Sequence, residues 1–348
     1  MGLNEKFFKS AAGGITASDN FEPVIYTGNG GTKSITSLNF QPDFTWIKQR
    51  SSPSRDHVLN DSVRGANKIL YSNLTNAEDT AGGSGSAYFN SFDSNGFTVG
   101  SSIYYNGSSL DYVAWNWKAG GAAVSNTDGT ITSQVSANVD AGFSIVSYTG
   151  GSANQNVGHG LDETPQLIIV KNRDTAGNGW ATQSPFSGGA DYHMMLNLTQ
   201  EAKNNVDWIW NDTEPTSSVF SIGQNGITNT SGDKYIGYCF HSVDGYSKIG
   251  SYTGGGATNV TVNLGFSPRF VMIKRVNAVG NWTMYDNVRQ TGSVPYDNYT
   301  ILLADDAYQE QADDTIRGIQ FTSTGIVLNK NYDLTNTSGS TYLYLAIA

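Results

Sequence analysis

Short apolar runs with an alternating pattern recur along this chain of 348 residues. In TYLYLAI, at 341–347, the two tyrosines and the alanine fall on one face of an extended strand, while the leucines and the isoleucine fall on the other. FSIVSYTG, DYVAWNW and KYIGYCF have the same β-branched and aromatic character. Clusters of Gly, Asn, Asp and Ser separate these runs. The pattern predicts an all-β protein of the sandwich or jelly-roll type.

The predicted strands occur as a set that is repeated three times. SYTGG appears at 147–151 and 251–255, and IYTGN at 25–29. Each copy continues with a proline, an apolar run and a lysine, and closes on a related pair of strands. We therefore predict three tandem β-sandwich (jelly-roll-like) repeats, at residues 21–122, 142–244 and 245–348.

Two segments fall outside the repeats. Residues 1–20 are unlike any copy, and we predict a short N-terminal arm in which Phe7 and Phe8 dock to a partner, because exposed apolar side chains mark interaction sites. Residues 123–141 are polar, and they are expected to form an extended linker or an added edge strand.

Two short sequence patterns recur in every copy, and each predicts a structural role. Tyr-Thr favours a strand, and the glycine that follows supplies backbone freedom at a turn. YTG is therefore expected to end the first strand of each copy, although a binding loop built on the bare glycine backbone is the alternative. The lysines that follow the apolar runs, Lys48, Lys171 and Lys274, are expected at strand ends with their charges in water.

The composition narrows the range of functions. The formal net charge is −10 and the isoelectric point is near 4.7, which disfavours binding to nucleic acid because that binding uses clustered Lys and Arg. The single cysteine, Cys239, allows no disulfide within the chain and is expected to be a small buried apolar residue. No apolar stretch is long enough to predict membrane insertion.

Catalytic patterns are missing from the sequence. The four histidines are not at metal-ligand spacing, and neither a C-x-x-C pair nor a G-x-S-x-G elbow occurs. Glycoside hydrolysis requires two placed carboxylates, yet no glutamate recurs among the copies. We therefore predict a protein that is not an enzyme.

Three sets of residues remain as candidate binding sites. Copies one and three share D-x-x-R, which predicts ion pairs that tie a loop or, alternatively, a contact to a sugar or partner. Trp208 and Trp210 are expected on one strand face, either in the core or exposed for stacking on sugar rings. The segment 304–314 is acidic and predicts either a solvated loop or a Ca²⁺ site. The residues concerned are Asp61, Arg64, Asp286 and Arg289 for the first set, and Asp305, Asp306, Asp313 and Asp314 for the last.

Several phrases, among them FQPDFTWIK, FDSNGFTVGSS, YVAWNWKAGG and YIGYCFHSVDGYSKIGSYTGG, resemble a β domain of unknown function that is common in structural proteins of tailed bacteriophages. The resemblance covers residues 21–348. It implies a virion protein that is assembled in the host bacterial cytoplasm. The role it favours is that of a tail-fibre or tail-associated protein used in host adhesion. It also implies contacts with other virion proteins through the arm, a homo-oligomer (a trimer, as phage fibres are usually built) and a host-surface glycan or protein as receptor.

Three other functions stay open on the sequence. A capsid decoration or head-fibre protein would use the same modules at a different place on the particle. A free carbohydrate-binding module would use exposed aromatic side chains. A glycan depolymerase would require a pair of carboxylates that the sequence does not identify.

Overall fold

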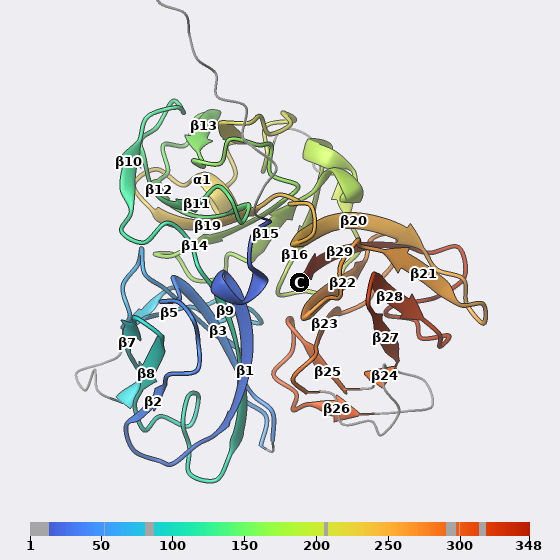
Figure 1. Ribbon diagram of the computed structural model, residues 1–348. Coiled ribbons are helices and arrows are strands. Elements are labelled where there is room, and N and C mark those ends of the chain that lie inside the picture. The colour runs from blue at the N-terminus through green and yellow to red at the C-terminus, as the bar shows by residue number, and fades with distance from the viewer. Residues whose placement is uncertain are drawn as a thin grey trace, which may run out of the picture.

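The computed structural model describes residues 14–51, 53–80, 87–204, 208–289, 297–298, 300–312 and 318–348. Almost all regular structure in these ranges is β, in antiparallel sheets, so the predicted all-β, sandwich-like fold is confirmed. Figure 1 shows three lobes gathered around a common centre, and the C-terminal residues lie where the lobes meet.

The lobe formed by the first copy is a sandwich of two sheets. Its larger sheet has the order β1-β9-β3-β4, and its smaller sheet has the order β2-β8-β7. A short 3₁₀ helix precedes the first strand, and a two-stranded ribbon, β5-β6, flanks the larger sheet. The bounds are η1 Ala17–Asp19, β1 Phe21–Thr27, β2 Lys33–Ile35, β3 Phe44–Gln49, β4 Val58–Asp61, β5 Lys68–Ile69, β6 Asp79–Thr80, β7 Phe89–Asp93, β8 Gly96–Val99 and β9 Asp111–Trp117.

The second copy repeats this topology. Its larger sheet contains the order β12-β19-β14-β15, extended at both edges, and its smaller sheet pairs β13 with β18. The bounds are β12 Phe143–Thr149, β13 Gln155–Gly158, β14 Leu167–Asn172, β15 Trp180–Gln183, η3 Pro185–Ser187, η4 Gly189–Asp191, β16 Tyr192–Met195, β17 Lys203–Asn204, β18 Val219–Ile222, α1 Gly226–Asn229 and β19 Lys234–Phe240.

The third copy has the same order again, with β20-β29-β22-β23-β25-β26 in the larger sheet and β21-β28-β27-β24 in the smaller one. The bounds are β20 Ser247–Thr253, β21 Val260–Asn263, β22 Phe270–Arg275, β23 Trp282–Asp286, β24 Asp297–Asn298, β25 Thr300–Leu303, β26 Gln311–Ala312, β27 Ile319–Thr322, β28 Gly325–Leu328 and β29 Thr341–Ile347.

The segment between the first two copies is part of a sheet. β10 (Val124–Asn126) pairs with β11 (Ser133–Asn138), and β11 pairs along its whole length with β12. The polar segment therefore adds two strands to the edge of the second lobe, which was one of the two forms expected for it.

The larger sheets are buried on both faces, and this explains their nearly continuous apolar runs. In β29, Tyr342 and Tyr344 face the interior of their own sandwich, while Leu343 and Leu345 face the other way, as the alternation predicts. The second faces of all three larger sheets meet in one apolar cluster that contains residues of every copy. The protein thus has a private core in each lobe and a shared core at the centre.

The repeated YTG ends the first strand of each copy, because β1, β12 and β20 all stop at its threonine. The glycine that follows accepts no side chain: a Cβ on Gly28, Gly150 or Gly254 would lie closer than 3.0 Å to a backbone oxygen of the loop that precedes the last strand of the copy. The phrase is therefore required for close packing of two backbone segments.

An asparagine from that same loop secures the turn in each copy. Asn106 Oδ1 accepts a hydrogen bond from Asn29 N at 2.8 Å, and the side chains of Asn229 and Asn336 accept from Gly151 N and Gly255 N at the same distance. All three asparagine side chains are buried. The contact is thus part of the shared architecture of the copies.

Candidate functional site: the junctions between the lobes

The three lobes join in a ring through equivalent backbone contacts. Glu78 N of copy one donates to Arg173 O of copy two at 2.7 Å, and Ala202 N of copy two donates to Val276 O of copy three at 2.8 Å. Glu310 N of copy three donates to Arg50 O of copy one at 2.9 Å, which closes the ring. The first and last copies are therefore joined as directly as neighbours in the sequence.

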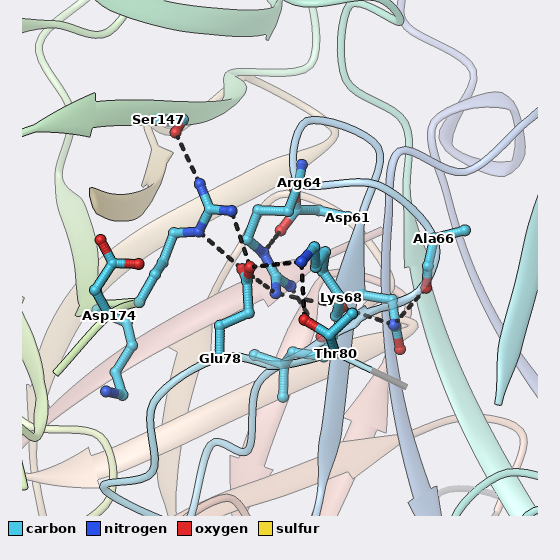
Figure 2. Close-up of polar contacts among 12 residues, drawn as sticks. Asp61, Arg64, Ala66, Lys68, Glu78, Thr80, Ser147 and Asp174 are labelled. Atoms are coloured by element: carbon cyan, nitrogen blue, oxygen red, sulfur yellow. Dashed lines mark hydrogen bonds and ion pairs between the residues drawn. The ribbon is translucent and has the colours of Figure 1, made fainter. Parts of the chain in front are cut away.

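The junction between copies one and two holds a buried ion-pair network around Glu78 (Figure 2). Arg64 Nε lies 2.5 Å from Asp61 Oδ2, with both side chains 0% exposed, and Arg64 Nη1 lies 3.3 Å from Glu78. Arg173 of the second copy binds the same glutamate at 2.8 Å. Tyr238 completes the junction by donating its hydroxyl to Asp61 at 2.8 Å.

The electrostatics of this network favour the charged forms. Burial would lower the pKa of Arg64, but the carboxylates of Asp61 and Glu78 raise it above its usual value. For Glu78, burial acts to raise the pKa, and hydrogen bonds and charge from Arg173 and Arg64 outweigh that effect and lower it. The network therefore keeps its charges inside the protein because each one is paired.

The junction between copies three and one repeats the arrangement. Arg289 Nε lies 2.5 Å from Asp286 Oδ2, again with both side chains 0% exposed, and Glu310 binds both Arg289 (3.3 Å) and Arg50 of the first copy (2.7 Å). The indole N–H of Trp115 donates a hydrogen bond to Asp286 at 2.9 Å, and the Arg289 guanidinium lies over the Trp115 ring in a cation–π contact.

The third junction, between copies two and three, is uncharged at the equivalent positions. By strand register, Ser184 stands where the other copies have the aspartate, and Leu345 stands where they have Trp115 and Tyr238. Ala202 and Val276 replace the glutamate and arginine and pack against the shared core. The loss of D-x-x-R in copy two is thus one of several coordinated changes at a single junction.

Burial decides between the two interpretations of D-x-x-R in favour of the loop-tying ion pair. A sugar or a partner protein at the surface would not reach side chains that are fully buried and paired. The expectation that no glutamate recurs was wrong, because Glu78 and Glu310 hold equivalent positions in copies one and three and connect these ion pairs to the neighbouring copy. The signal that could have identified the two glutamates is that arginine, aspartate and glutamate are all replaced at the junction between copies two and three.

The three repeated lysines are buried, so the expectation that their charges reach water was wrong. Each ammonium donates to backbone carbonyls: Lys48 to Gln49 (2.8 Å) and to Ala307 of copy three (3.1 Å), and Lys274 to Thr199 of copy two (3.0 Å). Lys171 donates to Asn172. Burial lowers the pKa of each of the three to about 8. Two of the three lysines therefore help to join the lobes.

One family covers the whole of this ring: the family described as "Domain of unknown function (DUF7483)" matches residues 16–348. The chain belongs to that family. No curated protein matches the chain. Because the match spans all three copies, the family corresponds to the complete ring and not to a single repeat.

The two candidate tryptophans of this family member do not share a strand face. They lie in a turn outside any strand, and the two residues that follow Trp210, Asn211 and Asp212, have left-handed φ values of 53° and 47°. Trp210 is buried in the core of the second lobe, whereas Trp208 is 63% exposed. The core interpretation holds for Trp210 alone, and Trp208 is available at the surface.

Of the four aspartates considered for Ca²⁺, Asp313 and Asp314 lie outside the described residues, as do Phe7 and Phe8 of the arm. Asp305 accepts hydrogen bonds from Trp282 N and Asn281 Nδ2, both at 3.0 Å, and burial raises its pKa to about 6. Asp306 accepts from Tyr308 N at 3.0 Å. Within the described ranges, no group of three or more His, Cys, Asp or Glu side chains is placed to hold a metal ion.

Cys239 is buried, as expected, and burial raises the pKa of its thiol to about 12. A membrane-spanning helix would have to be longer and more apolar than any helix in the described ranges.

Proposed function

We propose that this chain is a structural protein of a bacteriophage virion, and specifically a tail-fibre or tail-associated protein that presents rigid β domains to the host surface. The observation that carries the proposal is the use of the recurring residues. The YTG turn, the buried asparagine and the buried lysine occur in every copy, and all of them hold the architecture. Recurring residues that serve only the architecture are expected of a structural and binding protein.

The ring of lobes suits attachment because it is rigid. Apolar and ionic contacts connect all three lobes, so the loops that separate the strands are held at fixed positions relative to one another. Rigid presentation lowers the entropic cost of binding, and several copies on one particle would multiply weak contacts. A homo-oligomer, for which a trimer remains our expectation, would extend the same effect.

The arm is proposed to dock to other virion proteins. Its described part already contacts the ring, because Ile15 and Ala17 pack against the shared core. The described start of the chain is therefore held against the ring, which supports an anchoring role for the arm.

Labelling of purified particles tests the proposal. An antibody against the chain, applied to intact phage whose genome encodes it, is expected to decorate the tail in electron micrographs, and the same antibody preabsorbed with the purified chain should leave the particles bare. Decoration of the capsid would replace the tail assignment with the capsid-decoration alternative. Absence of the chain from purified particles by mass spectrometry would overturn the virion assignment.

A further inference from the structure

A surface hollow of about 500 Å³ opens at the junction between the first and second lobes. Its walls include Tyr71 and Tyr104 of the first copy together with Asp56, Asn76 and Asp79, and Ala176 lines it from the second copy. This volume falls within the range typical of small-molecule sites. Neither arginine nor lysine lines it among the residues that the structure describes.

Two half-buried tyrosines form the aromatic part of the hollow. The rings of Tyr71 and Tyr104 are 6.0 Å apart between centroids and inclined at 62°, so that one ring stands edge-on to the face of the other. Such a corner offers flat apolar faces while the hydroxyls stay within reach of water.

The module itself does not require tyrosine at these two positions. The carbonyl of Tyr71 accepts a hydrogen bond from the indole N–H of Trp180, and the carbonyl of Met195 accepts the same bond from Trp282. Tyr71 of copy one is therefore equivalent to Met195 of copy two. In each copy the hydroxyl of the YTG tyrosine donates a hydrogen bond to one backbone carbonyl, and Tyr104 is the residue just before that carbonyl's residue in copy one. The equivalents of Tyr104 in the other copies are therefore Ile227 and Leu334. Met195, Ile227 and Leu334 are thus the apolar side chains found at these positions in other copies, and they pack in or against the cores of their lobes.

The polar groups of the hollow are open to a ligand. The Asp79 carboxylate and the hydroxyls of Tyr71 and Tyr104 have no hydrogen-bond partner among the described residues, and Asp56 accepts only from Asn73, at 2.6 Å. Glu78 also lines the hollow, but its oxygens are bound by the two arginines of the junction. Burial and then the charge of Asp79 raise the pKa of Tyr71, so its phenol remains a donor at neutral pH.

We propose that this hollow binds a neutral glycan of the host surface, with one sugar ring stacked on the tyrosine corner and its hydroxyls donated to Asp56 and Asp79. Sugar rings carry apolar C–H faces and many hydroxyl donors, which match these two features. Uronic acids, sialic acids and phosphates are excluded by like charge. The inference rests on the proposed function, since it names the receptor class of an attachment protein.

The test uses the purified full chain and a panel of soluble oligosaccharides, half of them neutral (hexose and N-acetylhexosamine) and half carrying uronate or sialate, with binding measured by calorimetry and ligand-observed NMR. Neutral members are expected to bind. Tyr104→Leu, which installs the residue of the third copy, should weaken binding roughly tenfold through loss of the stacking face. Asp79→Asn should weaken it by a smaller factor, and Trp208→Ala should leave it unchanged.

Unchanged thermal unfolding of Tyr104→Leu shows that its lost affinity is local, and the exposed Asp79→Asn variant tests the site if Tyr104→Leu does not fold. The proposal is overturned if no neutral member binds, if anionic members bind more tightly, or if Trp208→Ala abolishes binding while Tyr104→Leu retains it. A chain located on the tail that fails this test leaves the virion assignment standing, so the two proposals fail separately.

Discussion

Replacing Arg64 by serine is expected to lower the free energy of unfolding by about 3–5 kcal/mol, the usual cost of breaking a buried ion pair from one side. The Arg64 side chain is fully buried and binds Asp61, Glu78 and two backbone carbonyls. Its removal leaves the Asp61 carboxylate buried with only the Tyr238 hydroxyl as a side-chain partner. Urea unfolding of the full chain measures the loss.

The second copy supplies the matched control for this prediction. It carries Ser184 and Ser187 where the first copy carries the aspartate and arginine, so the double variant Asp61→Ser/Arg64→Ser reproduces a pair that the fold already accepts. Adding Asp61→Ser to the arginine variant should recover at least about 1 kcal/mol, because the unpaired charge is removed. Additive losses would contradict the account, as would an Arg64→Ser variant as stable as the parent.

Replacing Gly28 by alanine is expected to cost about 2–3 kcal/mol of unfolding free energy, the range for overpacking in a filled interior. A Cβ there would meet two backbone groups, Gly107 O and Asn106 C, both closer than 3.0 Å. Backbone cannot rotate away as a side chain can, so the strand end or the loop has to move. The equivalent changes at Gly150 and Gly254 should act in the same direction.

Gly31 of the same loop gives the control for the glycine prediction. A Cβ on Gly31 would come no closer than 3.7 Å to a neighbouring atom, and its φ is not in the left-handed region. Gly31→Ala should therefore stay within about 0.5 kcal/mol of the parent. Equal losses from Gly28→Ala and Gly31→Ala would show that the repeated glycine serves flexibility alone and not close approach.

The sequence predicted the β-sandwich character and the parity of the strands, because these follow from local alternation. It did not predict that the larger sheets would meet in a shared core. A strand that is apolar on both faces is compatible with any covering layer, and the layer here comes from copies about one hundred residues away.

The same limit explains the misplaced charges. Lys48 lies near the end of its strand, where a charged side chain usually reaches water, yet one of its partner carbonyls, that of Ala307, lies in another copy. Trp208 was placed beside Trp210 on a strand because the two are separated by one residue, but this segment forms a turn. In both cases the deciding contact or conformation is invisible to a local pattern.

The repeated residues and the residues unique to one copy have different significance for function. Those that occur in all three copies are committed to turns and junctions, so they identify the architecture. Tyr71 and Tyr104 occur in one copy only and line a hollow, and a search for repeated signatures passes over them. In a chain built from copies, departures from the repeat are therefore the better guide to a binding site.

The three copies form one ring that is expected to fold as a unit, and differential scanning calorimetry of the full chain shows whether it does. Because the shared core and all three junctions must break together, we expect a single transition whose calorimetric enthalpy equals its van't Hoff enthalpy. Two or three separate transitions, or a calorimetric enthalpy several times the van't Hoff value, would show that the lobes unfold independently and would contradict the account.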